Sequence, residues 1–455
     1  MRAFARQMTE RMKAVAAGGA VAAFWLAVWV FAAALVAQPL ILPGPGTVAV
    51  ALLRLVCDAG TWAILVGSGT RILGGLALAA ACGGVMAGAS VRSLTFARLV
   101  APALSFVKAT PVACIVVLLL IWLGSARVSI VAVFLMALPG VYFSLVEGLT
   151  QADKPLKQMF RLHGVRGWRL FCAHTWREVL PFVLSCARAV IGMSWKAGVA
   201  AELIGMAVGT VGERIYQAKL LIETADLLAW TVLVVAASWA CERVLVWLLR
   251  VSGSVTWRAA VRSHGRGLHG RAGAADVAEL ALAVGDRAPW APALDGLVLN
   301  VPAGGRICVM GTSGVGKSTL LALAAGECAP CSMVFQDVRL VEGASALDNV
   351  LVCADARVDA SSAAALLRLL VPGVDMHARV AELSGGQRRR VEIARALLCP
   401  GGAVILDEAF TGLDTAARDA CAEVVLDLLD GRMLLLATHD AVDAQALNIS
   451  DIITL

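Results

Sequence analysis

Charged residues are scarce in this chain of 455 residues. Only 16% are Asp, Glu, Lys or Arg, whereas 59% are hydrophobic, and the mean hydropathy is +0.80. Soluble globular proteins average about 25% charged residues, so this composition excludes a chain that is soluble throughout. We therefore expect part of the chain to lie in a membrane.

The small net charge and the lack of paired cysteines also limit the classes of function that this chain can have. The net charge is only +6, and the basic residues gather between apolar runs, which indicates orientation in a bilayer and excludes nucleic acid as the expected partner. The twelve cysteines form one C-x-x-C pair, Cys328 and Cys331, and are otherwise scattered, so no disulfide framework is expected. No second pair or histidine cluster completes a metal site, and an ordinary loop is favoured over a redox or zinc role. The sequence has no internal repeat of solenoid period.

Six apolar runs of spanning length occupy the first part of the chain. The first, 14–37, is too long for a signal-peptide core and lacks a good cleavage site, so it is expected to remain as a helix. Lys and Arg are concentrated before this run and in 151–180, which places both termini in the cytoplasm. The other spans are predicted at 72–89, 101–123, 128–149, 181–206 and 227–249.

Polar residues inside the spans are costly and are therefore candidate functional residues. Lys108, Lys196 and Glu202 stand out. Lys196 and Glu202 are six positions apart, so they do not share a helix face and need not pair. A cation would suit an anionic substrate, but Lys108 can equally snorkel to the interface. We assign no functional role to Glu202.

The composition changes after the last span. Residues 251–274 are small, polar and glycine-rich, which predicts a cytoplasmic linker. From about 275, short apolar strands alternate with helical runs, the pattern of an α/β domain. The predicted organisation is an all-α polytopic membrane domain (1–250), a linker (251–274) and an α/β nucleotide-binding domain (275–455).

A phosphate-binding loop lies in this last domain. Residues 311–318 match G-x-x-x-x-G-K-[ST] between an apolar strand and a helix, which is the context that the motif requires. Glycines let backbone N–H groups surround phosphates at a helix N-terminus. Lys317 would reach the terminal phosphates, and Ser318 would hold Mg²⁺. The expected ATP-binding residues are Gly311, Thr312, Ser313, Gly314, Val315, Gly316, Lys317, Ser318 and Thr319, with Trp290 as either the adenine-stacking residue or an ordinary packed tryptophan.

A second motif follows downstream. Residues 403–408 form an apolar run that ends in the carboxylates Asp407 and Glu408. A buried central strand would place both beside the phosphate loop. Asp407 then fits a Mg²⁺ ligand, and Glu408 fits the base that polarises the attacking water.

Between these motifs lies a sequence that resembles the signature of the ATP-binding cassette (ABC) family, and the resemblance covers about 275 to 455. It implies that Gln336 senses Mg²⁺ and couples to the membrane part, that Asp414 is the D-loop aspartate, and that His439 contacts the γ-phosphate. It also implies that two cassettes enclose ATP, so this chain needs a second one, most simply from another copy of itself. The signature residues are Leu383, Ser384, Gly385, Gly386 and Gln387.

The cassette departs from the family in one respect. Only eighteen residues separate Lys317 from Gln336, fewer than is usual. We therefore expect the accessory β-subdomain after the first helix to be reduced, with the chemistry retained.

The membrane half, 43–249, resembles permeases of the nitrate, sulfonate, taurine and thiamine-precursor importer group. The resemblance rests on residues 70–75, 110–113 and the loop 151–180. This loop matches the spacing of E-A-A-x-x-x-G and its later Leu-Pro, which implies coupling helices that dock near Gln336. Gly164, Leu180 and Pro181 are kept, whereas Gln158 replaces Glu and Met159 and Phe160 replace the alanines.

Together these patterns predict ATP-driven import of a small solute across the cytoplasmic membrane, by alternating access. Expected partners are a second copy of the chain, an extracytoplasmic solute-binding protein, the solute and lipid, with ATP and Mg²⁺ as cofactors. An exporter, a membrane-tethered ABC ATPase without transport and a degenerate regulatory cassette remain as alternatives. The sequence distinguishes neither the substrate nor a homodimer from a heterodimer.

Overall fold

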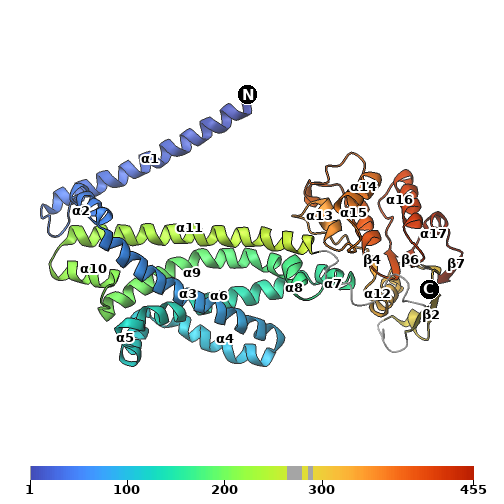
Figure 1. Cartoon of the computed structure of the whole chain (residues 1–455), viewed down its shortest axis with the longest axis horizontal. Coiled ribbons are helices and arrows are strands. Elements are labelled where there is room, and N and C mark those ends of the chain that lie inside the picture. Colours follow the sequence, from blue (N-terminus) through green and yellow to red (C-terminus); the bar gives the residue numbers. More distant parts are fainter. Residues whose placement is uncertain (1, 264–278, 285–290) are drawn as a thin grey trace. The chain divides into compact units, whose positions relative to one another are not determined.

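The computed structural model describes residues 2–263, 279–284 and 291–455, which form two compact units. The helical unit comprises Met1–Gln151 and Val179–Arg250, and the α/β unit comprises Ala152–Glu178 and Val251–Leu455. Figure 1 colours both units along the sequence. The α/β unit thus contains a segment, residues 152–178, that the chain inserts between two parts of the helical unit. We call it the coupling segment.

The helical unit consists of helices that begin at polar caps. The side chain of Asp58 accepts a hydrogen bond from Thr61 N, and Ser93 and Thr210 cap the following helices in the same way. The helices are α1 (Arg2–Val36), α2 (Pro45–Cys57), α3 (Ala59–Arg92), α4 (Leu94–Ala109), α5 (Val112–Leu123), α6 (Ser125–Gln151), α9 (Trp176–Gly205), α10 (Val211–Leu220) and α11 (Thr224–Arg262), of which α9 and α11 extend into the α/β unit.

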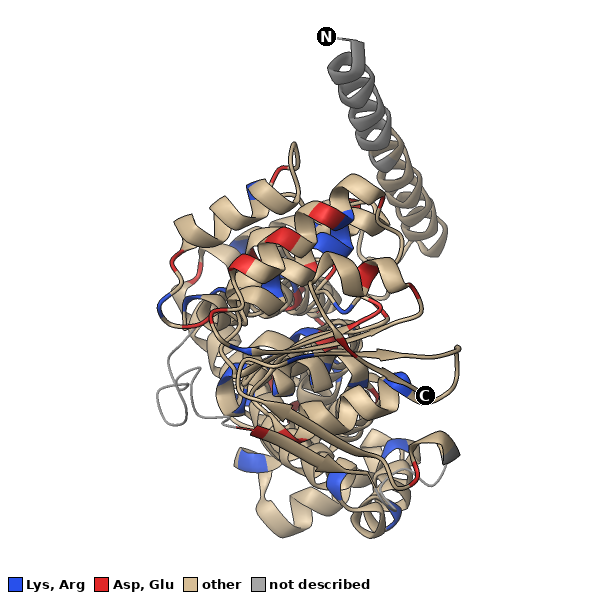
Figure 2. Cartoon of the chain, turned by 90° about the vertical axis from the view of Figure 1, so that its right-hand side faces the viewer, with Lys and Arg blue, Asp and Glu red and all other residues tan. Residues whose placement is uncertain are grey.

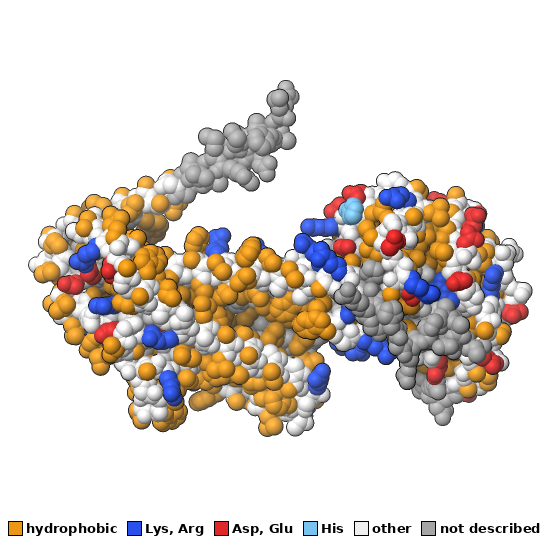
Figure 3. All heavy atoms as spheres, viewed as in Figure 1, with side chains coloured by type: hydrophobic (Ala, Val, Ile, Leu, Met, Phe, Trp, Pro, Cys, Tyr) orange, Lys and Arg blue, Asp and Glu red, His pale blue; other side chains and the backbone are white. Residues whose placement is uncertain are grey.

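Several of these helices are long and apolar enough to cross a membrane. Among the described residues there are five such helices, or six if the bent pair α4 and α5 is one span. Hydrophobic side chains cover much of the visible face of these helices (Figure 3). The predicted spans 72–89, 128–149 and 227–249 lie within α3, α6 and α11. The chain is therefore a multi-pass membrane protein.

Two predicted spans differ from the structure. The span at 101–123 is not continuous, because α4 and α5 meet at 102° around the extended residue Thr110 and Pro111. Proline disfavours helical backbone at the preceding residue and donates no N–H itself. The span at 181–206 starts earlier, since helical structure runs unbroken from Gly167 through α8 (Gly167–Leu170), the π-helical turn η1 (Phe171–Thr175) and α9. Leu180 and Pro181, expected in a loop, therefore lie within α9.

The core of the helical unit depends on close packing of α3 against α6. Ile72 and Val133 are fully buried there. A Cβ atom on Gly75 would lie 2.4 Å from the carbonyl oxygen of Ile130. Only glycine fits this approach.

The α/β unit is built on a parallel sheet of five strands in the order β4-β5-β6-β3-β7. A separate antiparallel pair joins β1 to β2. The strands are β1 (Glu279–Ala283), β2 (Val298–Pro302), β3 (Arg306–Met310), β4 (Ser332–Val334), β5 (Ala403–Asp407), β6 (Met433–Thr438) and β7 (Asp451–Thr454).

Both faces of this sheet are buried. Along β5, Ala403 and Ile405 belong to one hydrophobic cluster, whereas Val404 and Leu406 belong to another. Strand β6 alternates in the same way, so the two clusters occupy opposite faces. This explains why the central strands read as continuous apolar runs.

Helices supply the partners of these two faces. One face packs with α12 and β1–β2, and the other with α14, α15 and α16. The helices of the α/β unit carry Lys, Arg, Asp and Glu residues on the side that faces the viewer in Figure 2. The helices are α7 (Lys154–Leu162), α12 (Lys317–Glu327), α13 (Ala346–Leu351), α14 (Ala360–Leu370), α15 (Gly385–Leu398), α16 (Thr415–Asp427) and α17 (Ala441–Ala446), with 3₁₀ turns at Pro292–Leu294 and Val380–Glu382.

The predicted linker is helical over its first half. Helix α11 continues to Arg262, and the Ser254 and Thr256 hydroxyls donate to carbonyls of the preceding turn. Their polar groups are thus satisfied inside the helix. Trp257 and Ala260 are buried in the α/β core, which is why a polar, glycine-containing stretch stays helical here. Residues 264–274 of the predicted linker lie outside the described residues, and the boundary at 275 stays a prediction.

We predict that Gly75→Val destabilises the helical unit by about 1–3 kcal/mol, because the added atoms must displace the backbone of α6. The neighbouring Gly74→Val is the matched control, since a Cβ atom there meets nothing within 4 Å. Loss of monodisperse protein on heating in detergent measures the effect. Equal behaviour of the two variants would contradict the close α3–α6 packing.

Candidate nucleotide site

The predicted site residues gather at one edge of the parallel sheet. The phosphate loop follows β3, Gln336 comes two residues after β4, Asp407 ends β5, and His439 follows β6. Parallel strands bring their carboxyl ends to the same edge, where open α/β sheets bind ligands.

The phosphate loop has the backbone that its glycines permit. Gly314 and Gly316 adopt φ values of 84° and 114°, in the left-handed region. Gly316 caps α12, and a Cβ atom on it would approach Leu294 Cγ to 3.2 Å. The buried Lys317 ammonium donates to the carbonyls of Gly311 at 2.7 Å and Thr312 at 3.1 Å. The loop thus holds a lysine and a helix N-terminus, which suits an anion.

The Asp407 carboxylate fits a magnesium ligand. It is only 3% exposed and accepts a hydrogen bond from Ser318. Burial raises its pKa, and the Ser318 hydrogen bond opposes the shift. Its Oδ1 atom is buried and has no hydrogen-bond partner among the described residues. A carboxylate oxygen that lacks a partner, beside a hydroxyl, is the kind of oxygen donor set that Mg²⁺ binds.

Glu408 lies between the two other predicted catalytic residues. Gln336 Nε2 donates to Glu408 Oε2 at 3.3 Å, and His439 Nδ1 lies 3.9 Å from Glu408 Oε1. The Glu408 backbone has φ of 48°, and its N–H donates to Ala437 O on β6. Positive φ is uncommon for glutamate, and such backbone occurs at sites where the surrounding structure fixes a side chain.

The signature residues begin helix α15. Ser384 caps the helix and forms a capping box with Gln387, whose Oε1 accepts from Ser384 N at 2.9 Å. Within the described part of the chain, no hydrogen bond or ion pair joins residues 383–387 to residues 311–319. Asp414 caps α16 by accepting from Ala417 N. The signature residues and Asp414 thus lie at the N-termini of α15 and α16. Their roles in ATP binding stay predictions.

Sequence reasoning missed a buried charged network in α15. Glu392 is fully buried and pairs with Arg389 at 3.0 Å and with Arg395 at 3.3 Å. The spacing of three along the helix is the signal that could have revealed it. Burial raises the pKa of Glu392, whereas both arginines lower it.

This network holds the loop that carries Gln336. Arg389 donates to the carbonyls of Phe335 and Gln336. Glu392 accepts from Arg339 N at 3.1 Å, and Arg395 donates to Arg339 O. The helix that starts at the signature is thus bonded directly to the Gln336 loop.

The remaining candidates are spread over the molecule. Trp290 lies outside the described residues. Lys108 and Lys196 are exposed on α4 and α9, whereas Glu202 is buried and accepts from Ser68 Oγ at 2.8 Å. The nearest cation to Glu202 is Arg71, at 3.8 Å, and not Lys196.

The C-x-x-C pair lies in the interior of the α/β unit. Cys328 and Cys331 are both free and buried, and burial raises their pKa values to about 11 and about 12. Thiols with such values are poor nucleophiles and poor ligands. Over the described ranges, no group of three His, Cys, Asp or Glu side chains could hold a metal ion.

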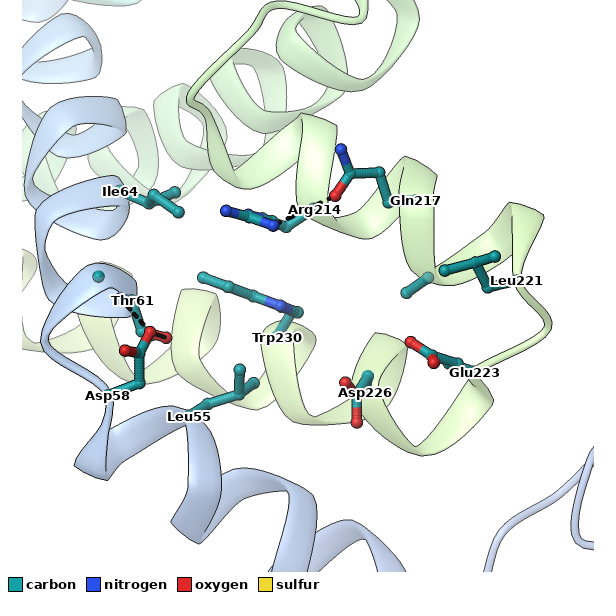
Figure 4. Close-up of a pocket in the computed structure, with 12 residues that line it drawn as sticks. Leu55, Asp58, Thr61, Ile64, Arg214, Gln217, Leu221, Glu223, Asp226 and Trp230 are labelled. Carbon is teal, nitrogen blue, oxygen red and sulfur yellow. Dashed lines mark hydrogen bonds between the residues drawn. The ribbon is translucent and has the colours of Figure 1, made fainter.

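A pocket of about 310 Å³ lies in the helical unit (Figure 4). Trp230 from α11 and Arg214 from α10 point into it, across from Asp58 and Thr61 at the start of α3. None of the predicted site residues lines this pocket.

Both the membrane unit and the α/β unit match models of known protein families. Residues 80–253 match the family model of the binding-protein-dependent transport system inner membrane component, and residues 294–411 match that of the ABC transporter. The aliphatic sulfonates import ATP-binding protein SsuB 1 of Rhizobium johnstonii is 35% identical over 33% of this chain and 64% of its own length.

Two further relatives are covered more completely. Another aliphatic sulfonates import ATP-binding protein, SsuB 1 of Paracoccus denitrificans, is 33% identical over 37% of this chain and 74% of its own length. The taurine import ATP-binding protein TauB of Chromobacterium violaceum is 38% identical over 34% of this chain and 68% of its own length.

The fold and site thus define a phosphate-loop ATPase joined to a multi-pass membrane unit. With these matches, the chain belongs to the ABC transporter family. It is an ATP-hydrolysing transporter in which permease and cassette share one polypeptide.

We predict that Glu392→Gln destabilises the α/β unit by about 3–5 kcal/mol, because two buried guanidinium groups lose their counter-charge. Hydrogen exchange at residues 335–339 should rise, since these residues are bonded to the network. Glu423→Gln on the exposed surface of α16 is the control. Unchanged exchange and thermal unfolding in Glu392→Gln would show that the network does not hold this loop.

Proposed function

We propose that this protein imports a small solute across the cytoplasmic membrane at the expense of ATP. The observation that carries the proposal is the combination, on one chain, of an importer-type permease match with an ABC cassette. Residues 152–178, which correspond to the importer coupling loop, belong to the same compact unit as the cassette.

In this proposal the nucleotide residues keep the roles expected from the sequence. Residues 311–319 bind the ATP phosphates, with Lys317 at the terminal ones. Glu408 accepts a proton from the attacking water. Gln336, which donates to Glu408, senses Mg²⁺ and couples to the membrane part, and His439, 3.9 Å from Glu408, contacts the γ-phosphate. Ser318, Asp407 and Gln336 would hold Mg²⁺, which supplies positive charge toward the phosphates.

Hydrolysis requires a second cassette in this account. Residues 383–387 begin their own helix and are not bonded to residues 311–319 of the same chain. A second copy would bring its signature to this phosphate loop, so we propose a homodimer. Two states with different nucleotide affinity then give alternating access.

The proposed substrates follow from the relatives. The similar cassettes are named for import of aliphatic sulfonates and taurine. We therefore propose a small solute of the sulfonate, taurine, nitrate or vitamin-precursor kind, delivered by an extracytoplasmic solute-binding protein. In this proposal the cassette lies in the cytoplasm and the chain in the inner membrane, which the positive residues at the N-terminus and in 151–180 support.

ATPase activity of the full-length protein in lipid nanodiscs tests this function. We expect stimulation by one binding protein when it carries its ligand. Glu408→Gln should lower the rate about 10²–10⁴-fold, because it removes the proposed base. Glu423→Gln serves as the surface control.

Two results would contradict the proposal. A wild-type rate that no loaded binding protein changes would count against import. Activity retained in Glu408→Gln would remove the proposed base.

A further inference from the structure

We propose that the coupling segment is a fixed structural part of the cassette, in which His163 is a positioning residue for the Gln336 loop. In this inference the permease supplies hydrophobic core and strand-edge cover that the shortened cassette lacks. It concerns the fold of the α/β unit and holds whichever solute is carried.

The first observation is that the coupling segment lies in the cassette core. Met159 and Phe160 are fully buried and belong to the same cluster as Leu320 and Leu321 of α12. These are the two positions where the importer pattern has alanine. Their larger side chains fill the interior of the unit. Other members of this cluster from the coupling segment are Leu156, Val165, Leu170, Cys172 and Ala173, and Trp257 and Ala260 join it from the end of α11.

The second observation is the short connection from α12 to β4. Helix α12 ends at Glu327, and β4 starts at Ser332, so the chain returns to the sheet through four residues. The sequence prediction of a reduced β-subdomain is therefore correct. Among the described residues, β4 is an edge strand of the sheet and no further strand pairs with its outer side.

The coupling segment covers this edge instead. Helix α7 ends at Leu162, whose carbonyl accepts from Cys331 N at 3.0 Å. Met333 N donates to His163 Nε2 at 3.1 Å. Free carbonyls at a helix end and free N–H groups at a sheet edge thus satisfy one another.

Two features fix His163 in this position. Gly164 has φ of 78°, and Val165 N returns to Phe160 O at 2.8 Å, which closes the end of α7 in a Schellman-type turn. The imidazole is fully buried, and burial together with the charge of Arg395 lowers its pKa to about 3. The ring is therefore neutral. Its Nε2 atom lies 3.1 Å from Met333 N and 3.2 Å from Met333 O, and the tautomer protonated at Nδ1 accepts from the Met333 N–H.

Further contacts tie the same segment to the helical layer. Arg169 Nη2 donates to Val352 O at 2.6 Å, and Arg339 Nη1 donates to Pro155 O at 3.3 Å. From the end of α11, Trp257 Nε1 donates to Asp348 Oδ2 at 3.1 Å. The first two bonds join the coupling segment to cassette residues that are far from it in the sequence.

The contacts lead directly to the nucleotide site. Met333 is three residues before Gln336, whose carbonyl is held from the other side by Arg389. The Gln336 loop therefore lies between His163 of the permease segment and the helix that starts at the signature. A displacement of either one reaches Gln336 and its bond to Glu408.

Hydrogen exchange of full-length protein in nanodiscs tests the edge contact. In His163→Ala, we expect the Met333 amide to exchange about tenfold faster, because one hydrogen bond is lost. His163→Gln, whose side-chain oxygen can accept the same bond, should exchange at an intermediate rate. His174→Ala is the matched control, since His174 is equally buried in the segment but bonds to Asp153 O within it.

ATPase kinetics give a second readout. We expect His163→Ala to lower kcat with little change in the KM for ATP, with partial rescue in His163→Gln. Because a loss of folded protein also lowers the apparent kcat at unchanged KM, the rates of the three proteins are compared per amount of folded protein. Unchanged exchange of the Met333 amide in both His163 variants would overturn the inference, whether or not any binding protein stimulates the ATPase.

The core contact has its own test. Phe160→Ala should lower the temperature at which the α/β unit unfolds, and the milder Phe160→Leu should lower it less. Trp168→Ala is the control within the same segment, because Trp168 is 73% exposed. A coupling helix that only touches the cassette surface predicts no difference among the three variants, and that result would overturn the inference.

Discussion

The edges and faces of one parallel sheet constrain the rest of the α/β unit. Both faces of β5 and β6 are buried, so each needs a covering layer, and the edge strand β4 exposes N–H groups that need acceptors. Helix α12 and the β1–β2 pair cover part of one face. The coupling segment completes that face and bonds to the β4 edge. The coupling segment of the permease thus provides part of the core and the edge contacts of the sheet that carries the nucleotide site.

This arrangement gives a short physical connection between transport and hydrolysis. Strand β4 leads into Gln336, and Gln336 is bonded to Glu408 at the end of the neighbouring strand β5. The Arg389–Glu392–Arg395 network ties the same loop to the helix that starts at the signature. Three elements with different roles therefore meet at one loop. Because these groups are buried and bonded, movement of one is expected to shift the others.

Much of this could be predicted from the sequence, where a local motif decides the structure. The phosphate loop and the carboxylates Asp407 and Glu408 were predicted to meet at one sheet edge, because strand order follows from the fold class. The linker was predicted at 251–274, but α11 continues to Arg262. A polar composition does not show that Trp257 is buried in the α/β core. The break between α4 and α5 occurs at Pro111, and a proline at this position could have predicted it.

Contacts that depend on tertiary packing could not be predicted from the sequence. Met159 and Phe160 could be recognised as departures from the importer pattern, but not as core residues. Nothing local to His163 indicates that it accepts from Met333, 170 residues away. The spacing of three shows that Glu392 can pair with Arg389 and Arg395, but it does not show that Glu392 is buried.

One measurement tests the central claim that the coupling segment remains part of the cassette throughout the transport cycle. Hydrogen exchange at Cys331 and Met333 would be followed in the full-length Glu408→Gln protein, without nucleotide and with ATP and Mg²⁺. The account predicts that both amides stay equally protected in the two states. Loss of protection in either state would show that the segment leaves the β4 edge, and would contradict it.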